Sequence, residues 1–111
     1  MAQYLLIESR DPFEYADTTY MYDLAGDLVG KGNNVTLFLI QNGVLCARRN
    51  VKDNPVAGLR QKAPGIRVEA DDFSLRERGI STGNLAEGVT VSNVDNLVDR
   101  LVQSDTKIVW H

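Results

Sequence analysis

The sequence contains few of the residues that build disulfides and metal centres. Its 111 residues include one cysteine, Cys46, and one histidine, His111. A single cysteine excludes a disulfide within the chain, and a lone histidine argues against a histidine-based zinc site or a catalytic triad in one chain. We therefore expect no metal and no cofactor.

An excess of basic residues and a long apolar run are also missing. The net charge is -3 and the pI is about 5.0, so the protein has no general positive field to attract nucleic acid. No apolar stretch approaches the roughly 20 residues of a membrane-spanning helix. The start, MAQYLLIESR, lacks the features of a signal peptide. We expect a cytoplasmic protein with no nucleic-acid or membrane partner, folded as a single domain over residues 1–111.

Apolar and β-branched segments indicate the strands. Buried strands are predicted at residues 4–7, 34–40, 66–70 and 107–110, and residues 88–91 fit either a short strand or an extended connection.

Segments of helical periodicity lie between these strands. Helices are predicted from residue 16 to the glycines at 30 and 32, and at 55–63, 72–78 and 94–102, with a short helical turn in the segment VLCARR. Asn54 is a good N-cap, and Ser92 with Asp95 resembles a capping box. The alternation predicts a three-layer α/β/α sandwich with a mostly parallel sheet of about five strands.

Polar residues follow the predicted strands at their carboxyl ends, where open parallel sheets bind ligands. The candidate binding residues are Glu8, Ser9, Asp11, Gln41, Asn42, Gly43, Asp71 and Asp72. Cys46 and His111 share this edge of the sheet.

Two interpretations of the acidic pair Asp71 and Asp72 remain open. One of the two aspartates can cap the helix that starts near Phe73, which typically contributes about 1 kcal/mol. Alternatively the pair acts as a general base or as part of a metal-binding carboxylate cluster with Glu8 or Asp11.

Cys46 also has two interpretations. Its neighbours Val44, Leu45 and Ala47 predict a buried, inert thiol whose pKa is raised by burial. The nearby Arg48 and Arg49 would instead favour a thiolate able to carry sulfur as a persulfide. We expect burial to dominate, because arginine side chains can reach solvent.

Other aromatic and basic residues are expected in structural roles. Phe13, Tyr15, Tyr20 and Tyr22 are expected in the core or at an interface, because no basic groove accompanies them. Arg76 and Arg78 are expected to be solvated, or to pair with acids across a subunit contact.

Nearly the whole chain resembles the DsrE/DsrF-like family of small sulfur-relay proteins. The resemblance rests on YLLIESRDPFE, on DLAGDLVGKGNNVTLFLIQNGV, on IRVEADDFSLRERGI and on the closing KIVWH. It implies a DsrE-like fold, assembly into trimers or hexamers, and contacts with sulfur-relay proteins. In sulfur-transferring members, a persulfide-accepting cysteine lies eight residues before the glycine of the RG pair. That position is Asp71 here, counted back from Gly79.

Three functions are compatible with this sequence. The favoured hypothesis is a DsrE-like protein without the catalytic cysteine, acting as a non-catalytic oligomeric subunit or binding module in intracellular sulfur metabolism. The second is a sulfur carrier or sulfurtransferase that uses Cys46. The third is a protein, or an enzyme of another kind, that binds a small molecule or metal through Glu8, Asp11, Asp71 and Asp72.

Overall fold

The computed structural model describes residues 1–111 and contains one sheet of five parallel strands in the order β4-β3-β2-β1-β5. The strands are β1 (Gln3–Glu8), β2 (Asn34–Leu39), β3 (Arg67–Asp71), β4 (Val89–Ser92) and β5 (Thr106–Trp110). The predicted α/β fold with a parallel sheet is confirmed. The segment that the sequence left open, 88–91, contributes an edge strand.

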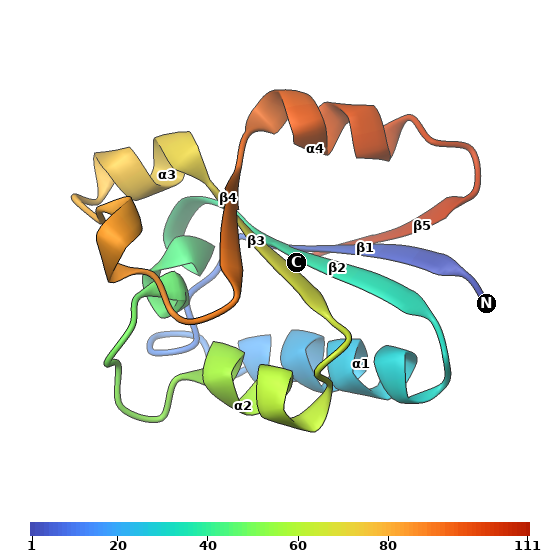
Figure 1. The fold of residues 1–111 in the computed structure, drawn as a ribbon, viewed down its shortest axis with the longest axis horizontal. Helices are drawn as coiled ribbons and strands as arrows, with labels where there is room; N and C mark the ends of the chain where they lie inside the picture. Colours follow the sequence, from blue (N-terminus) through green and yellow to red (C-terminus); the bar gives the residue numbers. More distant parts are fainter.

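The helices cover the two faces of the sheet unequally. They are α1 (Thr18–Gly30), α2 (Pro55–Lys62), α3 (Asp72–Glu77) and α4 (Val94–Leu101), with 3₁₀ segments η1 (Gln41–Ala47) and η2 (Thr82–Asn84). Figure 1 shows α1 and α2 side by side below the sheet, α4 above it, and α3 beyond the end of β3. None of these helices combines the length and the apolar character needed to cross a membrane.

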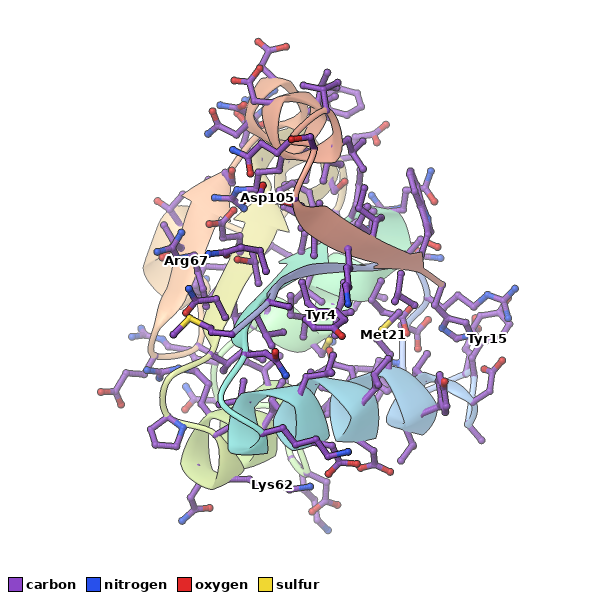
Figure 2. All side chains as sticks on the ribbon, turned by 90° about the vertical axis from the view of Figure 1, so that its right-hand side faces the viewer. Tyr4, Tyr15, Met21, Lys62, Arg67 and Asp105 are labelled. Atoms are coloured by element: carbon purple, nitrogen blue, oxygen red, sulfur yellow. The ribbon has the colours of Figure 1, made fainter.

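The hydrophobic core is larger on the face of the sheet that α1 and α2 cover. A cluster of 18 buried residues, including Met21, Leu37 and Val56, fills the space between the sheet and α1 and α2. Figure 2 shows Met21 pointing from α1 toward the sheet, whereas Tyr15 projects outward from the loop before α1. On the α4 side the buried cluster contains only Leu5, Ile7, Phe38 and Leu97. The second face of the sheet is therefore only thinly covered.

Local sequence signals identify several helix boundaries. The Asn54 side chain accepts a hydrogen bond from the Val56 amide at 2.9 Å, as predicted. Gly79 has a φ of +67°, the left-handed conformation that ends α3 without strain on a side chain. The short helical turn predicted in VLCARR starts earlier, at Gln41, and ends at Ala47.

The capping box predicted at Ser92 is wrong. Ser92 is the last residue of β4, and the N-cap of α4 is Asn93. The Asn93 side chain accepts a hydrogen bond from the Asn96 amide at 2.8 Å. Asparagine caps as well as serine does, so the strand pairing that holds Ser92 decides between the two.

The strand order creates a switch point between β1 and β5. The chain moves outward from β1 through β2 and β3 to β4, and then returns to the other side of β1 to form β5. Connections from β1 and toward β5 therefore leave the sheet on opposite faces, with α1 below and α4 above (Figure 1). In open α/β sheets this arrangement opens a crevice at the carboxyl ends of the two strands.

Candidate functional site

Asp71 caps α3 from the end of β3. Its Oδ2 atom accepts hydrogen bonds from the Ser74 amide at 2.9 Å and from the Ser74 hydroxyl at 2.7 Å. The side chain is buried, and its Oδ1 atom has no hydrogen-bond partner. The capping interpretation of this aspartate is confirmed.

Asp72 does not join Asp71 in a common site. Its side chain is partly exposed and forms an ion pair with Arg76 at 3.5 Å on the surface of α3. Arg76 is solvated, as the sequence predicted, with 68% of its side chain exposed. Two adjacent carboxylates thus serve different structural purposes.

The 3₁₀ segment η1 is tied to α3 by side-chain hydrogen bonds. The backbone amide of Gln41 donates a hydrogen bond to the Ser74 hydroxyl at 2.8 Å. The Asn42 Oδ1 atom accepts from two guanidinium nitrogens of Arg78, at 2.9 and 3.0 Å, and a third nitrogen donates to the Ser74 carbonyl at 3.2 Å. The expectation that Arg78 is solvated is wrong, because its donors join α3 to η1 and only 24% of its side chain is exposed. Its pairing with an acid across a subunit contact stays a prediction.

Gly43 allows η1 to approach the end of β1. A Cβ atom at this position would lie 2.2 Å from the Glu8 carbonyl oxygen, which is a backbone atom that cannot move aside. Gly43 is thus required for packing between two segments of the sheet edge. Nothing in its surroundings indicates contact with a ligand.

Cys46 is buried in the main core. The thiol lies 2.8 Å from the Tyr22 hydroxyl and donates to the Gly43 carbonyl at 3.1 Å. Burial raises the pKa of the Cys46 thiol to about 11, although the hydrogen bond with Tyr22 opposes the shift. Neither Arg48 nor Arg49 is among the main causes of this shift. The expectation of a buried cysteine is confirmed.

Asp11 organises the loop after β1. Its Oδ1 atom accepts hydrogen bonds from the Phe13 amide at 2.8 Å and the Glu14 amide at 2.9 Å, and the side chain is buried. This is an Asx turn, in which an aspartate side chain accepts hydrogen bonds from loop amides that have no backbone acceptor.

Of the four aromatic residues expected in the core or at an interface, only Tyr22 is in the core. The loop and first helical turn leave Phe13, Tyr15 and Tyr20 between 43% and 66% exposed. Their expected place in the core is wrong, because Phe13 and Tyr15 lie in the loop before α1 and Tyr20 lies outside the buried face of that helix. A place at an interface stays a prediction.

A histidine clamp lies at the switch point. His111 Nδ1 is 2.9 Å from both Glu8 carboxylate oxygens, and His111 Nε2 is 3.2 Å from Asp17 Oδ2. Burial raises the pKa of Glu8, and the hydrogen bond from His111 partly opposes this. The same hydrogen bond to Glu8 raises the pKa of His111. A protonated His111 can donate from both ring nitrogens, which matches two carboxylate partners.

Sequence reasoning did not identify the clamp between Glu8, Asp17 and His111. One signal was available, because Glu8 ends the first strand and His111 follows the last, and strands on either side of a switch point are neighbours. The Ser9 hydroxyl donates to the His111 carbonyl at 3.0 Å and completes this corner.

Five of the eight candidate binding residues therefore fall into two groups instead of forming one site, and the side chains of Asp11 and Asp72 and the packing of Gly43 serve other contacts. Glu8 and Ser9 join His111 at the end of β1, whereas Gln41, Asn42 and Asp71 are linked through Ser74 and Arg78 at the end of β3. No group of three or more histidine, cysteine or acidic side chains is arranged to hold a metal ion. The proposed carboxylate cluster of Glu8, Asp11, Asp71 and Asp72 is not formed.

Comparisons with known proteins agree with this fold. A family model described as the DsrE/DsrF-like family matches residues 3–110. No curated protein matches the sequence.

Among solved structures, the ychN protein from E. coli is similar with a TM-score of 0.87 and 19% identity over 100% of both chains. The protein of unknown function MTH1491 from Methanobacterium thermoautotrophicum has a TM-score of 0.77 and 22% identity over 100% of both chains. The protein of unknown function BT1422 from Bacteroides thetaiotaomicron has a TM-score of 0.71 and 19% identity, covering 98% of this chain and 95% of the other. At these identities the likeness concerns the fold.

Proposed function

Because this chain belongs to the DsrE/DsrF-like family, we propose that it is a non-catalytic oligomeric subunit or binding module in cytoplasmic sulfur metabolism. In this proposal the chain assembles with copies of itself and takes part in sulfur relay without carrying sulfur on its own side chains.

The burial of Cys46 is the observation that carries the proposal. Sulfur transfer needs a thiolate that a persulfide donor can reach. The Cys46 side chain is 0% exposed, and its pKa of about 11 leaves almost no thiolate at neutral pH. The resemblance aligns the sulfur-accepting cysteine of the family with Asp71, whose carboxylate is engaged in capping α3 and cannot form a persulfide.

Thiol labelling of the folded protein tests the proposal directly. Cys46 should react with a thiol reagent at least about 100-fold more slowly than an exposed thiol, because reaction requires both opening of the core and deprotonation. A matched control is the double variant Cys46→Ser/Ser81→Cys, which places the single thiol at an exposed position of the loop before η2. Labelling of Cys46 at the rate of the control would contradict the proposal.

A persulfide assay tests the competing function, a sulfur carrier that uses Cys46. The protein is incubated with a cysteine desulfurase and cysteine, and its mass is then measured. We expect no added sulfur on the wild-type protein. Sulfur that is added to the wild-type protein, absent from Cys46→Ser and passed on to an acceptor thiol would establish the carrier function instead.

The proposed assembly is supported by an exposed apolar surface on the thinly covered face of the sheet. We call it the α4–β5 surface, and it consists of Val94, Val98, Val102, Ile108 and Trp110, whose side chains are between 41% and 75% exposed. The three valines recur every four residues and so form one stripe along α4 and its C-terminal end.

The two β5 residues face the same side of the sheet as α4. Ile108 pairs with Leu5 and Trp110 pairs with Ile7, and both partners belong to the buried cluster under α4. Neighbours in a parallel ladder point to the same face. The apolar side chains on this face of the sheet therefore continue from the part under α4 to the uncovered edge strand β5. We propose that a second copy of the chain packs against the α4–β5 surface.

Sedimentation or light scattering tests the assembly. A stable interface of this kind should bury about 1,000 Å² or more. We expect a trimer or hexamer at micromolar concentration, and we expect Trp110→Lys to shift the protein toward the monomer. Phe73→Lys, at an exposed aromatic position of α3, is the control and should leave the assembly unchanged. A monomeric wild-type protein would contradict this part of the proposal, whatever the outcome for Cys46.

A further inference from the structure

A pocket lined by three arginines lies beyond the carboxyl edge of the sheet, and neither Cys46 nor any residue of the histidine clamp lines it. It has a volume of about 310 Å³. Its lining residues are Leu45, Arg48, Arg49, Asn50, Arg78, Gly79, Ile80 and Asn84. They come from the end of η1, the end of α3 and the segment η2. We call this the arginine pocket.

Backbone hydrogen bonds hold the walls of the arginine pocket together. The Arg49 amide donates to the Asn84 carbonyl at 2.8 Å, and the Ala86 amide donates to the Ala47 carbonyl at 2.7 Å. Arg48 forms an isolated antiparallel bridge with Leu85. Together with the bond between Arg78 and Asn42, these contacts fix three segments that are distant in sequence. A pocket built in this way is present before a ligand arrives, which lowers the cost of binding.

Two of the three arginines of the pocket, Arg48 and Arg78, are oriented by neutral hydrogen-bond acceptors, which do not compensate their charges. Arg48 donates its Nε proton to the Leu45 carbonyl at 2.7 Å, so its terminal nitrogens stay free. Arg78 donates to an amide oxygen and a carbonyl oxygen. Arg49 has no side-chain partner at all.

No acidic residue lines the arginine pocket. The nearest carboxylate to any of the three guanidinium groups is that of Glu77, 3.8 Å from Arg78, and 55% of the Glu77 side chain is exposed. Three like charges repel one another. In a protein with more acidic than basic residues, surface arginines have many carboxylates available. The concentration of positive charge at this one concave place is therefore best explained by a negatively charged ligand.

The shape and polarity of the pocket indicate the class of that ligand. Guanidinium groups form two parallel hydrogen bonds with the oxygens of phosphate or sulfate. Asn50, with a φ of +62°, and Asn84 add amide donors to the lining. Leu45 and Ile80 supply an apolar wall. The volume lies at the lower end of the range for small-molecule sites, about 300–1,000 Å³.

We propose that the arginine pocket binds a tetrahedral oxyanion, a phosphate or sulfate group that is either free or carried by a small metabolite. Arg48 and Arg49 bind the oxygens of the anion, and Arg78, held by Asn42 and Ser74, supplies a fixed charge in the lining. This function goes beyond the role proposed above and does not depend on the reactivity of Cys46.

Calorimetric titration at constant ionic strength tests the proposal, with sodium sulfate, sodium phosphate and glycerol 3-phosphate as separate ligands. We expect saturable binding of one anion per chain with a Kd below about 1 mM. Tighter binding of glycerol 3-phosphate than of inorganic phosphate would identify a metabolite as the natural source of the group. Equal binding would identify the free ion. Absence of saturable binding up to about 10 mM would overturn the proposal.

Variants separate a defined site from general attraction by positive charge. Arg49→Gln should weaken binding by about tenfold or more, because a charged hydrogen bond to the anion is lost. The Arg49 side chain has no partner within the protein, and the variant keeps the backbone hydrogen bond to Asn84, so it should keep its fold, which circular dichroism verifies. Arg48→Lys keeps the charge and removes the planar donor pair, and it should also weaken binding.

The matched control is Arg76→Gln, which removes the same charge from α3 outside the arginine pocket. It should change the affinity by less than about twofold, because the Arg76 side chain does not line the pocket and a largely exposed charge is screened by solvent and salt. Equal weakening by Arg76→Gln and Arg49→Gln would show that net charge alone attracts the anion, and this result would overturn the proposal.

Discussion

His111 connects the two ends of the described chain by bridging two carboxylates, with Nδ1 2.9 Å from Glu8 and Nε2 3.2 Å from Asp17. Its backbone continues the pairing of β5 with β1, because the His111 amide donates to the Ile7 carbonyl at 2.8 Å and the Ser9 amide donates to the His111 carbonyl at 2.9 Å. The last residue of the sequence is therefore an integral part of the sheet edge.

The first prediction concerns pH. The pKa of His111 is raised above its ordinary value of 6.5 in the folded protein, mainly by the hydrogen bond to Glu8. The clamp therefore stabilises the fold fully below pH 6.5, and this contribution is lost as the pH rises through the folded pKa. Burial also raises the pKa of Glu8 above its ordinary value of 4.5. Its titration therefore lowers the free energy of unfolding as the pH rises as well, but in a range that begins at pH 4.5.

Urea denaturation at a series of pH values measures this effect. The free energy of unfolding of the wild-type protein should fall as the pH rises above 6.5. The variant His111→Gln should be less stable than the wild type at pH 6 and should show a flatter profile over the same window. Parallel profiles for the two proteins would show that the clamp does not contribute.

A second prediction concerns the cap of α3. Asp71→Ala should lower the free energy of unfolding by about 0.5–2 kcal/mol, because the Ser74 amide and hydroxyl lose their acceptor in a buried place. Asp71→Asn should cost less, since asparagine is an equally good N-cap. The control is Asp72→Ala, which removes a partly exposed ion pair and should cost less than about 0.5 kcal/mol. Equal losses for Asp71→Ala and Asp72→Ala would contradict this account.

Two glycines provide a matched test of close packing. Gly43→Ala should destabilise the protein by about 2 kcal/mol or more, because the new methyl group would collide with the Glu8 carbonyl. Gly58 lies within α2 with nothing within 4 Å of its hypothetical Cβ. Gly58→Ala should therefore stabilise the protein by about 0.4–1 kcal/mol. Thermal unfolding of both variants measures the contrast, and a tolerant Gly43→Ala would show that η1 can move away from β1.

Much of the fold could be predicted because its signals are local. The strands near Leu5, Leu37 and Val68 are buried on both faces and read as continuous apolar runs. Edge strands carry a weaker signal, and for this reason 88–91 was ambiguous: Thr90 and Val91 of β4 are exposed. The cap of α4 was misplaced by one residue because strand pairing, which is not local, decides where β4 ends.

The candidate sites depend on contacts that are distant in sequence and could be predicted only in part. Burial of Cys46 was predictable from its apolar neighbours. The role of Arg78 was not, because its partner Asn42 is 36 residues away. The arginine pocket likewise combines three segments whose proximity follows from the packing of η1, α3 and η2, and no short motif in the sequence indicates it.

The last prediction concerns the attachment of α4 to the sheet. Arg100 on α4 forms a bidentate ion pair with the carboxylate of Glu69 on β3, and Glu69 is buried. Leu97 is the only buried residue of α4. The attachment of α4 to the sheet therefore depends strongly on this ion pair. Replacing one partner leaves the other charge without compensation. Arg100→Met should therefore destabilise the protein by on the order of 3 kcal/mol, with some reduction because 24% of the Arg100 side chain is exposed.

The double variant Glu69→Met/Arg100→Met separates the cost of an unpaired charge from the value of the ion pair itself. Apolar side chains of similar volume can replace a buried ion pair at little cost. We expect the double variant to recover most of the stability that Arg100→Met loses in urea denaturation. A double variant as unstable as the single one would instead show that the ion pair itself stabilises α4. The same variants then report on the α4–β5 surface, because a detached α4 should also weaken the proposed assembly.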